Sequence, residues 1–268
     1  MEHYIAGFFG AGNMGGALAQ AACRAVPPEQ VAVVCSTPEH TQQTAARLGC
    51  RAADAEALIA GSRFLFLGIK PQQLDETAAR LRPAVLASSC VVVSMLAGVS
   101  LAMLEACFPE KRILRIMPNT PCAVGSGMTL LCRGTLATQE DADEFHELMR
   151  YSGRIDEISE RLMDAASAVA GCGPAFAYLF VQALADGGVA CGLPRAKAQA
   201  YAAQMLLGSA QMVLQSGTHP EALKDAVCSP GGSTIAGVRA LEDAAFRSAV
   251  MEAVLAAYEK TGRLAKKS

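Results

Sequence analysis

The sequence lacks an excess of charge of either sign. Its 268 residues include 23 Lys and Arg against 25 Asp and Glu, which gives a formal charge of −2. Such a chain has no basic field with which to hold phosphate backbones, so nucleic acid is not an expected partner. Charged residues make up only 18% of the chain and apolar residues 52%. This composition can offset the entropy of chain ordering, which argues against a disordered chain.

Metal, redox and targeting signals are also missing. None of the ten cysteines forms a C-x-x-C pair of the kind used in zinc or redox sites, so we expect free thiols and no metal. The N-terminus is not typical of a signal peptide, because an acid stands at position 2 and glycines interrupt its short apolar run. The apolar stretch Ala175–Ala185 is too short to span a bilayer. We therefore expect a soluble, cytoplasmic protein with no membrane partner.

Short β-rich runs alternate with segments of helical period up to about residue 135, which is typical of a parallel sheet covered by helices. The predicted strands are Ile5–Phe9, Val31–Cys35, Phe64–Ile69, Cys90–Met95, Arg112–Met117 and Met128–Cys132, with a further short strand at Ile155–Ile158. The predicted helices are 14–25, 38–48, 71–81, 100–107 and 138–151. After these elements the β signals vanish, and the rest of the chain indicates helices.

The segment Leu162–Gly192 is apolar nearly all round, apart from an interruption at Gly171–Pro174. A helix of this composition needs cover on every side. The helical residues that follow are too few to enclose it, so the pattern predicts a second chain, that is, a homodimer.

A glycine motif, G-x-G-x-x-G, directly follows the first predicted strand and opens the first helix. Its glycines permit the tight turn, the close approach of a pyrophosphate and the packing of helix on strand, while the helix N-terminus favours negative charge. The motif predicts cofactor-binding residues Gly10, Ala11, Gly12, Asn13, Met14 and Gly15. We therefore predict an α/β fold with an N-terminal Rossmann-type dinucleotide-binding domain over 1–160, followed by an all-helical dimerisation and substrate-binding domain over 161–268.

The end of the second predicted strand bears on which dinucleotide is bound. An NAD site uses an Asp or Glu there to bind the ribose hydroxyls, but no acid is present in Val34–Pro38. Hydroxyls of Ser36 and Thr37 would instead suit the 2′-phosphate of NADP, although they also suit the N-cap of the next helix. NADPH is therefore the preferred cofactor and NADH a possible one.

Residues at the ends of three further strands are additional cofactor candidates. Lys70 and Pro71 follow one strand, and an ordinary solvated lysine is an equally good interpretation of the first. Ala97 and Gly98 follow the next strand, and Asn119 stands in the M-P-N-T-P run after another. Small and Pro-restrained residues suit close approach to a nicotinamide, although ordinary loop chemistry also explains them.

The run Cys228–Thr234 places two glycines and two hydroxyls before a helical segment. Backbone N–H groups at such a start hold a carboxylate well, although a capped helix start is the plainer interpretation. The four histidines all lie outside the motifs, so the usual His acid of a hydroxy-acid dehydrogenase is missing. A protonated imine becomes a neutral amine on accepting hydride, and a hydroxyl such as Thr234 then suffices to orient it.

These motifs resemble those of the pyrroline-5-carboxylate reductases, which reduce 1-pyrroline-5-carboxylate to L-proline with NAD(P)H as the last step of proline biosynthesis. The resemblance extends over nearly the whole chain, and its most specific part is Leu223–Glu242. The other matching segments are GAGNMGGALA at 10–19, LGIKPQ at 67–72, SMLAGVS at 94–100, MPNTP at 117–121, GCGPAFAY at 171–178 and QALADGGVACGLPR at 182–195.

The resemblance implies a small-molecule substrate, an enzymatic function and particular substrate contacts. It implies that Thr234 hydrogen-bonds the substrate ring nitrogen as the catalytic residue and that Glu160 lies near the substrate. The substrate carboxylate is then held by amides of Gly231, Gly232, Ser233 and Thr234. It also implies a homodimer of interlocked C-terminal helices, and it leaves open whether dimers assemble further.

The sequence departs from the family pattern at three positions. Cys172 and Phe176 stand where the family usually has Ser and Tyr, which puts a polar role of that turn in doubt. Ala226 stands where some members have an Asn near the nicotinamide.

Two other functions fit part of the sequence. A β-hydroxyacid dehydrogenase opens with a similar glycine motif, but Ala177 stands here at the position of its catalytic Lys. A non-catalytic NADP-binding regulator would keep the fold, but its substrate loop should be eroded, and here the S-P-G-G-S-T loop is intact.

Overall fold

The computed structural model describes residues 3–265. The chain divides into two units: the first comprises the residues up to Cys172 together with those from Ala257 on, and the second spans Gly173–Ala256. Helix α12 (Phe246–Ala265) contributes residues to both.

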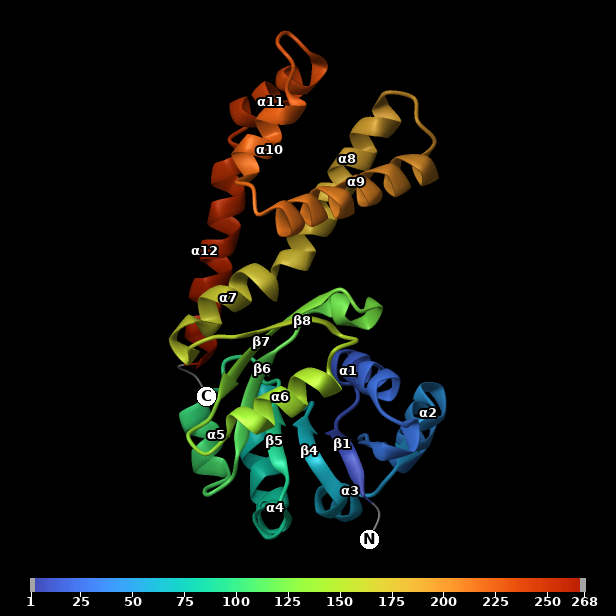
Figure 1. Cartoon of the computed structure of the whole chain (residues 1–268), viewed down its shortest axis with the longest axis vertical. Helices are drawn as coiled ribbons and strands as arrows, with labels where there is room; N and C mark the ends of the chain where they lie inside the picture. The colour runs from blue at the N-terminus through green and yellow to red at the C-terminus, as the bar shows by residue number, and fades with distance from the viewer. Residues whose placement is uncertain (1–2, 266–268) are drawn as a thin grey trace. The chain divides into compact units, whose positions relative to one another are not determined.

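Within the described residues, the centre of the first unit is a single sheet of eight strands (Figure 1). The strand order is β3-β2-β1-β4-β5-β6-β7-β8. The strands are β1 (Tyr4–Phe9), β2 (Val31–Val34), β3 (Arg51–Ala52), β4 (Ser62–Leu67), β5 (Val91–Ser94), β6 (Ile113–Met117), β7 (Gly127–Arg133) and β8 (Gly153–Glu157). All predicted strands are confirmed, while β3 was not predicted. Strands β6 and β7 pair antiparallel, unlike all other neighbours. Their connection is too short for the crossover that a parallel pair needs.

Helices cover both faces of this sheet. They are α1 (Asn13–Ala25), α2 (Pro38–Leu48), α3 (Ala55–Gly61), α4 (Leu74–Ala87), α5 (Leu101–Cys107), α6 (Gln139–Leu148) and α7 (Met163–Ala170). Short 3-10 turns lie at η1 (Pro28–Gln30), η2 (Pro71–Gln73), η3 (Thr120–Val124) and η4 (Glu160–Leu162).

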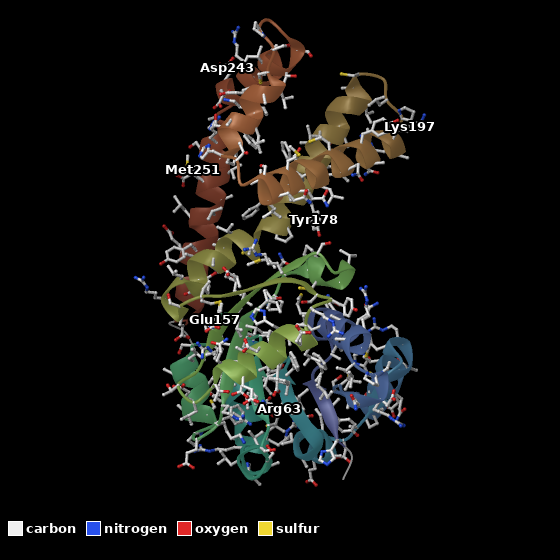
Figure 2. The ribbon with its side chains drawn as sticks, in the orientation of Figure 1. Arg63, Glu157, Tyr178, Lys197, Asp243 and Met251 are labelled. Carbon is white, nitrogen blue, oxygen red and sulfur yellow. The ribbon has the colours of Figure 1, made fainter. Side chains whose placement is uncertain are left out.

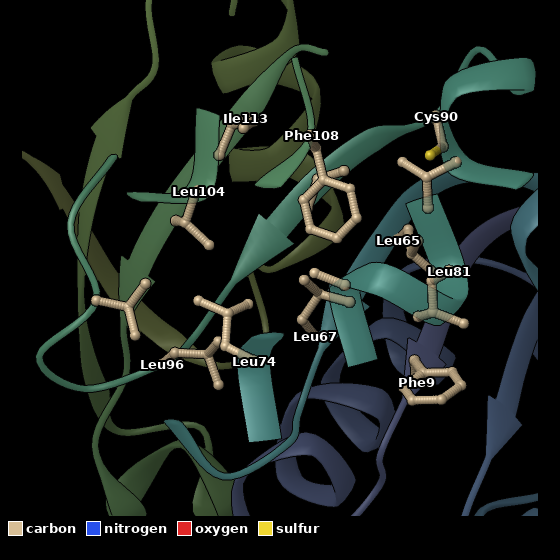
Figure 3. Packing of buried hydrophobic residues seen from close by; sticks show 14 of the residues in the cluster. Phe9, Leu65, Leu67, Leu74, Leu81, Cys90, Leu96, Leu104, Phe108 and Ile113 are labelled. Atoms are coloured by element: carbon tan, nitrogen blue, oxygen red, sulfur yellow. The ribbon is translucent and has the colours of Figure 1, made fainter. Parts of the chain in front are cut away.

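The strand side chains alternate between two hydrophobic cores because successive residues of a strand point to opposite faces. Phe8 and Phe66 lie in one core, where their rings stack with centroids 4.2 Å apart. Phe9 and Leu67 lie in the other core, which Figure 3 shows with helix residues such as Leu81 packed against the strands. The central strands are thus buried on both faces, as the continuous apolar runs of the sequence indicate.

Two helices differ from the prediction. Helix α3 was not predicted, although Asp54 caps it by accepting the Ala57 N–H at 2.8 Å. Helix α4 continues to Ala87 rather than ending near residue 81, with Pro83 inside it. Val85 beyond the proline is fully buried, so core packing outweighs the cost of the proline in this last turn.

The second unit is helical. It contains α8 (Gly173–Ala190), α9 (Arg195–Ser216), α10 (Pro220–Val227), α11 (Ser233–Asp243) and the first part of α12. Within the described part of this unit, the buried residues are only Ala185, Ala198 and Ala202. Large apolar side chains are exposed instead, including Tyr178 and Met251, labelled in Figure 2, and Leu179, which is 72% exposed. The unit therefore leaves much of its apolar surface without cover from its own chain.

One part of the chain has the length and composition of a membrane span. The segment Glu160–Ala190 has 31 residues and contains an 18-residue window with a mean hydropathy of 1.5, of which only 11% is buried. The prediction from Ala175–Ala185 alone therefore took too short a stretch. The segment Glu160–Ala190 contains two helices, α7 and α8, which are separated only by Gly171 and Cys172. The gap is this short because Pro174 is accommodated in the first turn of α8.

Candidate cofactor and substrate sites

The turn between β1 and α1 is shaped by its glycines. Gly10 has a positive φ of +95°, and a β-carbon there would overlap the carbonyl oxygen of Gly68. A β-carbon on Gly15 would overlap the carbonyl oxygen of Gly10. At Gly12, by contrast, nothing lies within 4 Å of where a β-carbon would be. The first and third glycines are therefore required by the protein itself, while the second leaves space for a ligand.

Helix α1 begins directly at this open space. Its N-cap is Gly12, which has no side chain to bond the free N–H groups of the first turn. These groups, together with the positive end of the helix dipole, favour an anion. The turn thus suits the pyrophosphate of a dinucleotide.

A cavity of about 770 Å³ lies beside the turn, at the carboxyl ends of β1, β2 and β4. Of the predicted cofactor residues, Gly10, Ala11, Gly12, Ser36 and Lys70 line it. Thr37 lines a neighbouring cavity of about 440 Å³, while Asn13, Met14, Gly15, Pro71, Ala97, Gly98 and Asn119 line neither. The carboxyl edge of parallel strands is the usual ligand site of open α/β sheets.

The lining residues of the larger cavity that were not predicted include His40, Glu56 and Arg80. His40 stands in the first turn of α2, three residues after Thr37, so the spacing from the N-cap indicates its place. Glu56 lies on the unpredicted helix α3. The Arg80 guanidinium lies over the Phe9 ring, 5.4 Å from its centroid, a contact between distant segments that no local pattern indicates.

Thr37 and Lys70 make local contacts in addition to the cofactor contacts predicted for them. The Thr37 hydroxyl caps α2 by accepting the His40 N–H at 3.2 Å, so the N-cap interpretation is confirmed. The Lys70 N–H donates to Gln73 Oε1 at 3.1 Å as the chain enters η2 with Pro71. The Lys70 side chain is exposed at the cavity and can meet a phosphate there.

The loop after β5 is tightly built. Ser94 is fully buried, and its hydroxyl accepts the Leu96 N–H at 3.4 Å. Gly98 has a φ of +75°, which favours glycine, and Ser100 then caps α5. Ala97 is exposed at the tip of the loop.

Asn119 uses both ends of its side chain to hold other segments. Its Oδ1 accepts the Met128 N–H at 2.9 Å, and its Nδ2 donates to the Ala170 carbonyl at 2.9 Å. The residue is 9% exposed. Asn119 therefore connects the turn after β6 to the end of α7, and its direct contact with a cofactor stays a prediction.

Glu160 lies in the first unit, at the start of η4. Its Oε1 accepts the Leu101 N–H at 2.6 Å and a hydrogen bond from Arg115 Nη1 at 2.8 Å. The residue lines a further cavity of about 630 Å³, together with Arg133, Glu157 and Cys132. Burial raises the pKa of the Cys132 thiol to about 11, so it stays protonated and donates to the Ile158 carbonyl at 3.0 Å.

The predicted substrate loop lies in the second unit. Gly231 has a φ of +69°, Gly232 is the N-cap of α11, and the Gly232 N–H donates to the Ser229 carbonyl at 3.0 Å. Ser233 and Thr234 occupy the first turn of the helix and are exposed. The loop thus presents backbone N–H groups and two hydroxyls at a helix N-terminus.

No group of three or more His, Cys, Asp or Glu side chains within residues 3–265 is placed to hold a metal ion.

Two family models match different parts of the chain. Residues 160–264 match the family described as pyrroline-5-carboxylate reductase dimerisation, and residues 5–98 match NADP oxidoreductase, coenzyme F420-dependent. The chain is similar to a pyrroline-5-carboxylate reductase of Escherichia coli, at 39% identity over 99% of this chain and 100% of the relative. It is likewise similar to one of Pisum sativum, at 38% identity over 98% and 97%.

A solved structure is also similar over the full chain. It is a Plasmodium falciparum pyrroline carboxylate reductase with NADP bound, at 33% identity and a TM-score of 0.88, covering 99% of each chain.

Proposed function

The chain belongs to the pyrroline-5-carboxylate reductase family, and we propose that the sites described above carry out this family's reaction, the NAD(P)H-dependent reduction of 1-pyrroline-5-carboxylate to L-proline. The observation that carries the proposal is the open space at Gly12, beside a cavity lined by predicted cofactor residues. Similarity over nearly the full length of named reductases supports it.

The cofactor is held by the first unit. The N–H groups at the start of α1, from Asn13 to Gly15, bind the pyrophosphate, and Lys70 adds a positive charge at the cavity. When bound, the reduced cofactor supplies the hydride. Ala97, Gly98 and Asn119 form the nicotinamide end, since they follow the next two strands along the sheet.

NADPH is preferred over NADH because the end of β2 carries hydroxyls in place of an acid. Ser36 bonds the 2′-phosphate, and the Thr37 hydroxyl, which already caps α2, lies beside it. The similar reductase structure with NADP bound supports the use of NADP.

The proposed substrate contacts are those that the family resemblance implies. Amides of Gly231, Gly232 and Ser233 bind the substrate carboxylate at the start of α11, and the Thr234 hydroxyl hydrogen-bonds the ring nitrogen. Glu160 favours the protonated ring through its negative charge. No strong acid is needed, because hydride addition converts the cationic imine to a neutral amine.

We further propose that residues 1–160 act as the cofactor domain and residues 161–268 as the dimerisation and substrate domain. A second copy of the chain covers the apolar faces of α8, α9 and α12, in keeping with the dimerisation family matched by residues 160–264. On this proposal, protein rather than lipid covers Glu160–Ala190, and the enzyme works in the cytoplasm without membrane or nucleic acid.

The dimer is tested by light scattering on two variants. Leu179→Arg changes a residue of α8 that is 72% exposed in the single chain, and we expect it to convert dimers to monomers. Leu136→Arg is the matched control, because Leu136 is 51% exposed on the first unit. A wild-type protein that is monomeric, or a Leu179→Arg variant with the wild-type mass, would contradict the proposed interface.

A further inference from the structure

Arg115 is a charged residue in the middle of the sheet. It lies on β6, where it pairs with Ser94 of β5 and Cys132 of β7, and it is 4% exposed. Its strand neighbours Leu114 and Ile116 are fully buried apolar residues. Placing a guanidinium here is costly unless its charge is matched by partners.

The carboxylates of Glu160 and Asp164 balance the positive charge of Arg115. Arg115 Nη1 donates to Glu160 Oε1 at 2.8 Å, and Nη2 lies 3.6 Å from Asp164 Oδ1. The Arg115 Nε is buried and has no hydrogen-bond partner among the described residues. The polar contacts of the guanidinium therefore go to Glu160 of η4 and Asp164 of α7 rather than to the sheet that surrounds it.

The carboxylate of Glu160 is held at one oxygen. Its Oε1 receives both the Arg115 bond and the Leu101 N–H at 2.6 Å, where α5 begins. All hydrogen bonds to Glu160 recorded for residues 3–265 end on this oxygen. The side chain is 35% exposed and lines a cavity, so Oε2 is left for another partner.

The charges of this group do not cancel. Glu160 and Asp164 carry two negative charges against the one positive charge of Arg115. A fixed, partly buried carboxylate with a surplus of negative charge attracts a small cation more strongly than a freely rotating one. A protonated cyclic imine is such a cation.

We infer that Arg115 is a positioning residue of the reductase: it fixes Glu160 through Oε1 so that Oε2 meets the protonated ring of the substrate. The inference rests on the proposed role of Glu160 at the substrate. Arg115 itself makes no substrate contact and acts through Glu160 and the start of α7.

The test compares steady-state kinetics of Arg115→Met with those of the wild type. Loss of a charge-assisted hydrogen bond predicts a rise in KM for pyrroline-5-carboxylate of about tenfold, with a smaller fall in kcat. NADPH binding, followed by fluorescence titration, should stay within about twofold, because α1 and its cavity are untouched. Arg115→Lys keeps the positive charge, so its KM should lie between those of the wild type and of Arg115→Met.

A matched control separates positioning from stability. Arg63→Met removes a guanidinium that holds the buried Asp141 at 2.8 Å, a similar ion pair away from Glu160. We expect it to lower the thermal unfolding midpoint while leaving KM for the substrate unchanged. An Arg115→Met variant that loses stability with an unchanged KM would overturn the inference.

A double-mutant cycle with Glu160→Gln provides the second readout. If Arg115 acts through Glu160, the double variant Arg115→Met/Glu160→Gln should have nearly the KM of Glu160→Gln alone. If the two residues act independently, the fold-changes in KM of the two single variants should multiply in the double variant. Should Arg115→Met not fold, the same cycle is run with Arg115→Lys, and multiplying effects there would overturn the inference as well. A wild-type enzyme without turnover would instead refute the proposed function, and a Glu160→Gln variant with unchanged KM would refute the role of Glu160 on which the inference rests.

Discussion

Gly10 and Gly68 face each other across the ends of β1 and β4 with no room for a side chain on either. A β-carbon on one would overlap the carbonyl oxygen of the other. The two segments are joined by a hydrogen bond from the Gly68 N–H to the Phe9 carbonyl at 2.8 Å. This backbone contact fixes the position of the turn between β1 and α1, while the space beside Gly12 stays open.

The glycines of this region should therefore respond differently to alanine. Gly68→Ala forces two backbones apart and should lower the free energy of unfolding by more than about 2 kcal/mol. Gly12→Ala meets no protein atom within 4 Å and should lower stability little, yet weaken NADPH binding at least about tenfold by occupying the space of the pyrophosphate. Chemical denaturation and NADPH titration measure the two effects. Equal stability losses, or unchanged NADPH affinity for Gly12→Ala, would contradict the account of this turn.

Ser36 should control cofactor choice. In Ser36→Glu, a carboxylate at the end of β2 repels the 2′-phosphate and binds the ribose hydroxyls, so the NADPH/NADH ratio of kcat/KM should fall by at least about tenfold. Ser36→Ala removes the hydroxyl without adding charge and should lower the ratio less. A ratio that does not change in Ser36→Glu would show that the 2′-phosphate lies elsewhere.

Thr234 should affect turnover rather than cofactor binding. Thr234→Ala removes the hydroxyl that orients the ring nitrogen, and we expect kcat to fall about tenfold or more while NADPH affinity stays nearly unchanged. Thr234→Ser retains the hydroxyl and should keep most of the turnover. Equal losses of kcat and NADPH affinity in Thr234→Ala would rule out the proposed role.

The second unit should lose stability in acid through Glu221. Hydrogen bonds from Arg247 and Lys224 lower the pKa of this carboxyl from 4.5 to about 2, and Arg247 also bonds Glu242 of α11, so that α10, α11 and α12 are joined. A lowered folded-state pKa adds stability above pH 4.5, and this contribution is lost as the pH falls through about 2.

The measurement is the thermal unfolding midpoint of the wild type and of Glu221→Gln across this range. The wild type should be the more stable above pH 4.5, and the difference should shrink toward pH 2. A difference that is the same at every pH would mean that ionisation of Glu221 does not stabilise the helices.

Local patterns predict much of this fold because the elements have local causes. Strand β1 and helix α1 follow from an apolar run and a glycine motif, and Thr37 and Ser100 mark helix starts by their caps. Helix α3 escapes such analysis because its seven residues are too few to display a helical period.

Contacts between distant segments are beyond the reach of sequence patterns. Glu160 meets Arg115 from 45 positions away, and Asn119 bonds Ala170 across 51. The sequence marks Glu160 and Asn119 as site candidates through resemblance and position, but nothing local indicates that both side chains are already bonded within the protein. Arg80 was missed for the same reason, because it reaches the cavity through its contact with Phe9, whereas Glu56 was missed together with the short helix α3.

The central claim is tested most directly by following the oxidation of NADPH, beside NADH, when pyrroline-5-carboxylate is added to the purified protein. The account predicts turnover with both cofactors and a higher kcat/KM with NADPH, with L-proline as the product. A protein that binds NADPH but reduces no pyrroline-5-carboxylate with either cofactor would contradict it.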